Sequence, residues 1–100
     1  MGLMLAGCAG DNKREQQTAD AAYTQCVRAA ARTLALSSSG PADQVAVAAA
    51  RSCPGQLKAV EDSRVLPLGG AYAAANYADS VVQDMAKTVE PDVVQARQGR

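Results

Sequence analysis

The most regular apolar pattern in the chain lies in residues 71–89, AYAAANYADSVVQDMAKTV. Its apolar positions follow spacings of four, three, four, three and four residues, which is the repeat of one helix face. These positions are Ala71, Ala75, Ala78, Val82, Met85 and Val89. Small residues at the start of this seam let a neighbouring helix approach closely, whereas the larger residues at its end fill a wider space. The pattern predicts a helix over about 70–90, which Pro91 interrupts.

A first helical segment lies nearer the amino terminus and is predicted over about 19–36. Apolar and small residues recur there at helical spacing. The seam comprises Ala19, Tyr23, Cys26, Ala30 and either Thr33 or Leu34. Arg28 and Arg32 lie on the other side of this helix, where we expect them to be solvated.

A serine-rich break, SSSGP, separates this helix from the next one. We expect Gly40 to cap, Pro41 to occupy the first helical position and Asp43 to lie in the first turn. The next seam comprises Ala46, Ala50, Cys53, Leu57, Val60 and Arg64. Pro54 removes a backbone donor within this seam, yet the seam continues in phase. The pattern therefore favours a kinked helix over about 41–65, or two collinear pieces, over a reversal.

These segments predict an all-α fold, either a small helical hairpin or a three-helix bundle. The chain has 100 residues, and we divide it into an apolar leader over 1–7, a polar stretch over 8–18 that is either a tether or the first turns of a helix, and a helical domain over 19–97. The net charge is zero and the basic residues are scattered, which excludes the electrostatic footprint of nucleic-acid binding.

The amino terminus resembles the lipobox of bacterial lipoproteins. The matching residues are Leu5-Ala6-Gly7-Cys8, a leucine, two small residues and the cysteine that receives lipid in that family. The resemblance implies removal of residues 1–7, a covalent lipid on Cys8 and no other cofactor. Because only seven residues precede Cys8 and none is charged, we expect the signal to begin upstream of Met1.

The resemblance also implies a location. Two or more acyl chains hold a protein stably on a bilayer. Ala9 follows the lipidated cysteine, which by the sorting rule of enterobacterial lipoproteins implies the periplasmic face of the outer membrane.

The remaining two cysteines, Cys26 and Cys53, suit a disulfide in an exported chain. They lie roughly 15 and 18 Å from the turn between their helices, at a rise of 1.5 Å per residue. In an antiparallel hairpin they therefore reach one height, and a disulfide would clamp the open ends of the hairpin. The alternative is two small buried residues chosen for close packing, which is the expectation for a cytosolic chain.

Catalysis receives little support from the residues. Histidine is absent, which removes the commonest general base and metal ligand, and the cysteines do not form a Cys-x-x-Cys pair. Asp79 and Asp84 lie on different helix faces, while Glu90 and Asp92 are expected to be solvated charges. We therefore expect no enzyme, no metal site and no catalytic residue.

The helix over 70–90 offers the candidate partner face. Its seam residues, Ala75, Ala78, Val82, Met85 and Val89, must be buried either by the hairpin or by a partner. The three tyrosines, Tyr23, Tyr72 and Tyr77, serve either as core residues or at such an interface. Packing on the hairpin is the favoured outcome, because an unpaired seam would cost solubility.

The sequence thus predicts a small lipid-anchored envelope protein of bacteria, a non-enzymatic interaction or structural module. Its expected partners are the membrane, through the anchor, and an envelope protein or a second copy. Two alternatives stay open: a secreted or envelope inhibitor-like binding module, and a cytosolic helical protein with free cysteines. The specific role is not encoded in any motif that we recognise.

Overall fold

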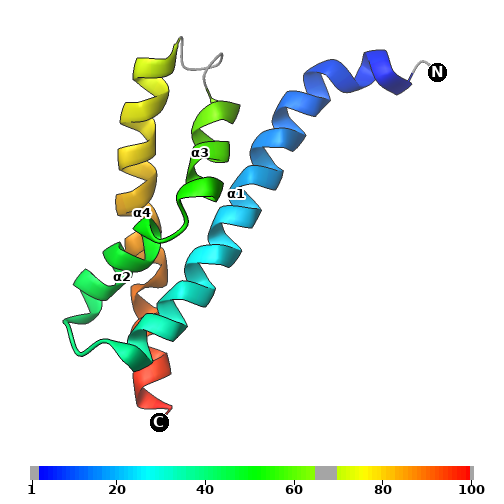
Figure 1. The fold of residues 1–100 in the computed structure, drawn as a ribbon. Helices are drawn as coiled ribbons and strands as arrows, with labels where there is room; N and C mark the ends of the chain where they lie inside the picture. The colour runs from blue at the N-terminus through cyan, green and yellow to red at the C-terminus, as the bar shows by residue number, and fades with distance from the viewer. Residues whose placement is uncertain (1–2, 65–69, 100) are drawn as a thin grey trace.

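The computed structural model contains four helices among the residues that it describes (Figure 1). It describes the backbone of residues 3–64 and 70–99 and the side chains of residues 13–64, 70 and 76–99. The helices are α1 (Leu3–Ser37), α2 (Ala42–Arg51), α3 (Pro54–Ser63) and α4 (Ala71–Gln98). The described part contains no strand, so the predicted all-α class is confirmed.

The helices form a three-helix bundle whose middle member is broken in two. In Figure 1, α1 and α4 run in one direction, while α2 and α3 run in the other. Helix α4 packs against α1, α2 and α3, and α1 packs against the other three. The molecule is elongated, with principal extents of 53 × 30 × 17 Å.

The core is built mainly from alanine and valine. Such small residues let helices approach closely, and the seams predicted for the middle and last helices lie largely in this core. The fully buried side chains of greatest volume are Tyr23, Val27, Val60, Val89, Val93 and Cys53. Short side chains packed along α1, the α2–α3 pair and α4 therefore form the core, in place of the larger aliphatic side chains of an average domain.

Helix α1 buries a wider face than the sequence predicts. Its fully buried residues are Tyr23, Val27, Ala31 and Ala35, while Cys26, Ala30 and Leu34 of the predicted seam are partly buried. Ala19 and Tyr23 of the predicted seam are therefore buried, whereas its later positions mark one margin of the buried face. The physical reason is that α1 contacts the α2–α3 pair on one side and α4 on another.

The break between α2 and α3 falls at Ser52 and Cys53. Pro54 occupies the first turn of α3, where its missing N–H does not interrupt a helix. The two pieces that the sequence allowed are therefore separate helices rather than one kinked helix. At the start of α2, Pro41 is the N-cap residue and not the first helical residue, and Asp43 lies in the first turn as expected.

Helix α4 continues through Pro91, so the predicted interruption is wrong. A proline in a helix interior costs about 3 kcal/mol. Val93, two residues beyond, is fully buried, and a buried valine side chain contributes about 1.5–3 kcal/mol. Packing of the segment after Pro91 on the bundle thus offsets most of the cost of the proline.

Helix α1 begins earlier than the predicted start at residue 19, because the polar stretch over 8–18 forms helical turns, which is one of the two possibilities that the sequence allowed. Lys, Arg, Glu and Gln in this stretch are good helix formers, so extending an existing helix through them costs little. The amino-terminal part of α1 projects beyond the bundle in Figure 1. Among the described helices, none has the length and hydropathy that crossing a bilayer requires.

Candidate functional site

Cys8 lies on the projecting part of α1, within a helical backbone. Its side chain lies outside the described residues, so the prediction that Cys8 carries a lipid stays a prediction. Ala19 is the first buried residue of α1 among the described side chains. Cys8 and Ala19 are eleven positions apart, which at 1.5 Å per residue places Cys8 about 16 Å along the helix from Ala19.

Cys26 and Cys53 are joined as a disulfide, with an Sγ–Sγ distance of 2.10 Å and a Cα–Cα distance of 6.2 Å. Cys53 is buried, with 2% of its surface exposed, and Cys26 is partly buried. The helix-rise argument thus predicted the pair that meets. The expected location at the open ends of a hairpin is wrong, because α3 extends the bundle beyond Cys53. The disulfide instead ties α1 to the break between α2 and α3.

Tyr23, on α1, also contacts the break between α2 and α3, where it satisfies the backbone carbonyl of Ala50. Its hydroxyl donates a buried hydrogen bond of 2.7 Å to the carbonyl oxygen of Ala50. In a continuous helix that carbonyl would accept the N–H of residue 54, but Pro54 has none. Burial raises the pKa of the Tyr23 hydroxyl above its ordinary value, which favours the protonated, donating form.

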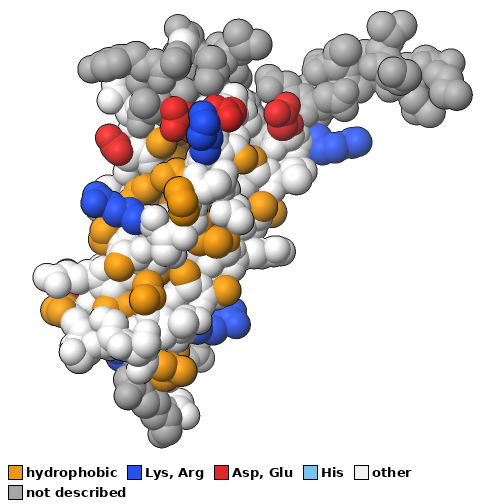
Figure 2. All heavy atoms as spheres, in the orientation of Figure 1, with side chains coloured by type: hydrophobic (Ala, Val, Ile, Leu, Met, Phe, Trp, Pro, Cys, Tyr) orange, Lys and Arg blue, Asp and Glu red, His pale blue; other side chains and the backbone are white. Residues whose placement is uncertain are grey.

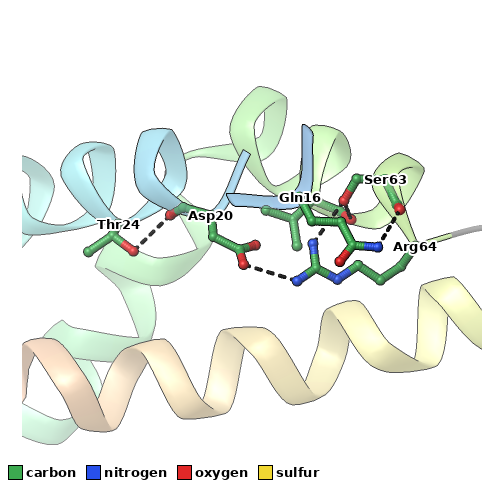
Figure 3. Close-up of polar contacts among 6 residues, drawn as sticks. Gln16, Asp20, Thr24, Ser63 and Arg64 are labelled. Carbon is green, nitrogen blue, oxygen red and sulfur yellow. Dashed lines mark hydrogen bonds and ion pairs between the residues drawn. The ribbon is translucent and has the colours of Figure 1, made fainter. Parts of the chain in front are cut away.

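A polar cluster joins the end of α3 to α1 (Figure 3). The Arg64 guanidinium forms an ion pair of 3.0 Å with Asp20 and donates to the Ser63 hydroxyl at 2.9 Å. That hydroxyl donates to the carbonyl of Val60 at 2.7 Å, and Gln16 donates to the Ser63 carbonyl at 3.3 Å. These bonds satisfy the carboxyl end of α3.

The Arg64 guanidinium also contacts α4. It lies 5.4 Å from the centroid of the Tyr77 ring on α4, in the arrangement of a cation–π contact. Arg64, expected only as a seam position, therefore connects α1, α3 and α4. Tyr77 is half-buried and Tyr23 belongs to the core, while the side chain of Tyr72 lies outside the described residues.

A second arginine closes the opposite end of the bundle. Arg97, in the last turn of α4, donates to the carbonyl of Ala35 at 3.0 Å and to that of Ser38 at 2.6 Å. These carbonyls lie at the carboxyl end of α1, where a helix dipole favours positive charge. The sequence offered no signal for this contact, since the two partners are about 60 residues apart.

The candidate partner face of α4 is occupied within the chain. Ala78, Val82 and Val89 are buried in the protein's own core, and Met85 packs against it as a partly buried residue. Ala86 and Val93 share this buried face, although they were not part of the predicted seam. The side chain of Ala75 lies outside the described residues. These residues are therefore not a free surface, because the hairpin already covers them.

A polar hollow between α1 and α4 was missed by sequence reasoning. It is lined by Arg28, Arg32, Asp92, Gln95 and Ala96. The sequence predicted Asp92 to be a solvated charge, and this prediction is wrong. Only 23% of its side chain is exposed, and its Oδ2 atom is buried. The nearest cation is the Nε atom of Arg28, 3.9 Å away.

The surface shown in Figure 2 carries hydrophobic side chains scattered between polar ones, with acidic side chains toward the upper end. Among the described residues, the exposed large hydrophobic side chains are Leu36 and Val94. The described residues contain no group of three or more His, Cys, Asp or Glu side chains arranged to hold a metal ion. Comparison of the chain with protein families, curated proteins and solved structures gives no significant match.

Proposed function

We propose that this protein is a small lipid-anchored envelope protein of bacteria that acts as a non-enzymatic interaction or structural module. The observation that carries the proposal is Leu5-Ala6-Gly7-Cys8, which has the residue types of a lipobox in the order that lipidation requires. The proposed anchor is a lipid on the Cys8 sulfur, and the proposed location is the periplasmic face of the outer membrane.

The cysteine pair supports export of the chain. Cys26 and Cys53 lie at bonding distance in the interior of the bundle. Disulfides persist in oxidising compartments such as the bacterial periplasm and are rare in the cytosol of most organisms. An exported chain with so few large aliphatic residues gains stability from such a cross-link, because the core alone contributes little.

The shape of α1 suits a protein held at a membrane surface. Cys8 and the first buried residue belong to one helix, so the anchor continues directly into the bundle. The helical connection that leads from Cys8 toward Ala19 holds the folded part away from the lipid headgroups and restricts its orientation. In this proposal the end that Arg97 closes points away from the membrane.

The polar side chains support a structural rather than a catalytic module. The hydroxyl of Tyr23 is used by the Ala50 carbonyl, and the guanidinium groups of Arg64 and Arg97 are used by helix ends. Catalytic groups are ordinarily held in a cleft and directed toward a substrate. Here Tyr23 and Arg97 donate to the protein's own backbone, and Arg64 donates to the side chains of Ser63 and Asp20.

The test is fractionation of bacteria that express the protein with its own upstream sequence. We expect the wild-type protein in the membrane fraction, labelled by radioactive palmitate, and Cys8→Ser in the soluble fraction without label. The matched control is the double variant Cys26→Ser/Cys53→Ser, which loses the other two thiols and must still be labelled. Globomycin, which blocks the lipoprotein signal peptidase, must cause the wild-type precursor to accumulate.

Two results would overturn the proposal in different ways. Unlabelled protein in the periplasm, with its disulfide intact, would favour the secreted binding module. Protein in the cytosol with three alkylatable thiols would favour the cytosolic alternative.

A further inference from the structure

An open groove of about 420 Å³ lies between α2 and α4, which pack against each other. Its apolar part consists of Val47, which is partly buried, and Ala86, which is 5% exposed. Its other lining residues are polar and exposed, namely Asp43, Gln44, Gln83, Lys87 and Glu90. The groove thus lies beside an exposed side of α4 and not beside the predicted seam, which is buried in the core.

The exposed side of α4 beside this groove has the spacing of one helix face. Its residues follow one another at intervals of four, three and four, and they are Gln83, Lys87, Glu90 and Val94. All four are exposed, and Val94 is one of the two exposed large hydrophobic side chains among the described residues. Lys87 and Glu90 form no ion pair with any described residue. We call these four residues, together with the groove, the α2–α4 face.

The charges on the α2–α4 face restrict what covers it. Lys87 and Glu90 are three positions apart, which is about 4.5 Å along the helix axis. A uniformly acidic or uniformly basic partner would be attracted by one of these side chains and repelled by the other. A second copy of this chain presents the same lysine and the same glutamate, so each Lys87 can reach the Glu90 of the other copy.

We propose that the α2–α4 face is the contact between two copies of this chain, which stand side by side with parallel α4 helices. A parallel pair sets Val94 against Val94 of the second copy at the two-fold axis and removes both from water. An antiparallel pair would form the same ion pairs but would set Val94 against the amide of Gln83. The parallel pair also places both copies of Cys8 at one end, and this reason alone rests on the proposed function, since two anchors in one leaflet require it.

The size of the α2–α4 face predicts a weak contact in solution. Gln83 and Val94 are eleven positions apart, which is about 16 Å of helix, and two packed helices are about 20 Å wide. The face therefore covers roughly 300 Å² per copy, whereas a standard interface covers about 800 Å² per partner. Confinement of both copies to one membrane surface raises their effective concentration, so a contact of this size suffices there.

The first experiment measures self-association of the full chain by NMR. The Cys8→Ser variant, with its disulfide intact, is diluted from about 2 mM, where a millimolar Kd is measurable. We expect concentration-dependent shifts confined to the α2–α4 face. Lys87→Glu should weaken association by about tenfold or more, and the exchange Lys87→Glu/Glu90→Lys should restore it. The matched control is Arg51→Glu, at an exposed arginine of α2 outside the face, which should associate as the parent chain does.

The second experiment tests the parallel arrangement in bacteria that express the chain with its own upstream sequence. Val94→Cys should form a disulfide-linked dimer under mild oxidation, because two residues at the two-fold axis meet each other. The matched control is Leu36→Cys on α1, which replaces the other exposed large hydrophobic residue and should stay monomeric. Equal cross-linking of both variants would overturn the proposal. Cross-linking of Gln83→Cys/Val94→Cys without cross-linking of Val94→Cys would also overturn it, in favour of an antiparallel pair.

The NMR measurement separates failure of this inference from failure of the lipid anchor, because Cys8→Ser has no site for the lipid. Shifts that vanish in Lys87→Glu and return in the charge exchange support the dimer, even if the wild-type chain proves to be unlipidated. An absence of concentration-dependent shifts would overturn the dimer, even if Cys8 proves to be lipidated. Shifts that the charge exchange does not restore would overturn the assignment of the contact to the α2–α4 face.

Discussion

Tyr23→Phe tests how the bundle tolerates the break in its middle helix. The substitution removes only the hydroxyl, whose hydrogen bond of 2.7 Å is the one that satisfies the Ala50 carbonyl. The ring stays in place, since only 1% of Tyr23 is exposed and phenylalanine fills the same space. We expect the variant to fold to the same structure with lower stability, because the carbonyl beside Pro54 loses its donor.

The size of the loss follows from the burial of the acceptor. A hydrogen bond of this type contributes about 1 kcal/mol net, and a buried acceptor left without a partner costs about 1–3 kcal/mol. The expected fall in the free energy of unfolding is therefore about 1–3 kcal/mol. With an m-value of about 1.5 kcal/mol/M, the midpoint of urea unfolding should fall by roughly 0.7–2 M at unchanged m.

Tyr77→Phe is the matched control for this measurement. Tyr77 is half-buried, and its hydroxyl makes no hydrogen bond with the described residues. Removing that hydroxyl keeps the ring under Arg64 and should change stability by less than about 0.5 kcal/mol. Equal midpoints for Tyr23→Phe and the wild type would refute the claim that Tyr23 compensates for Pro54.

The raised pKa of Tyr23 adds a pH dependence to the same comparison. An unfolded tyrosine ionises near its ordinary pKa of 10.0, while burial keeps the folded one protonated to higher pH. The unfolded state therefore binds fewer protons as the pH rises through 10.0, and the free energy of unfolding falls from there toward the raised pKa. Below that range the contribution is constant, and in Tyr23→Phe this part of the alkaline decline should be absent.

Three further predictions concern the cross-link, the core and the end of α1. The double variant Cys26→Ser/Cys53→Ser should lose about 3.5 kcal/mol, as the chain-entropy model gives for this loop, and reduction of the wild type should produce the same urea midpoint. Val82→Asp places a charge at a position with 5% exposure and should cost at least about 4 kcal/mol by thermal melting, whereas Val94→Asp, 40% exposed on the same helix, should change little. Arg97→Gln removes charged donors from two carbonyls and should cost about 1–2 kcal/mol, with faster hydrogen exchange at the end of α1 as the local readout.

Helical periodicity predicted the positions that local geometry controls. Ala46, Ala50, Cys53 and Val60 are all buried, because a seam at 3.6-residue spacing faces one side wherever the helix packs. The same rise per residue brought Cys26 level with Cys53. These results require only the pitch of a helix and the presence of one neighbour.

The features that the sequence did not reveal depend on contacts between distant segments. Pro91 appeared to be a helix end, because the burial of Val93 against the bundle is not visible in the local pattern. The pairing of Tyr23 with Ala50 requires knowledge of which carbonyl lacks a donor and which helix faces it. Asp92 looked solvated because only the tertiary fold sets it against α1.

The width of the buried face of α1 also depends on contacts between distant segments. A single seam suffices for a hairpin, but α1 is covered from two sides, so the partly buried Cys26 lies beside the fully buried Val27 and Ala31. A sequence pattern counts apolar positions without showing how many neighbours share them. The number of packing partners is therefore the information that the structure adds.

The proposed anchor is tested most directly by mass spectrometry of the amino-terminal peptide of the protein purified from its own bacterium. The account predicts a peptide that begins at Cys8, with a diacylglyceryl group on its sulfur and an acyl chain on its amine. A peptide that runs through Gly7 into Cys8 with a free, unmodified thiol would contradict it.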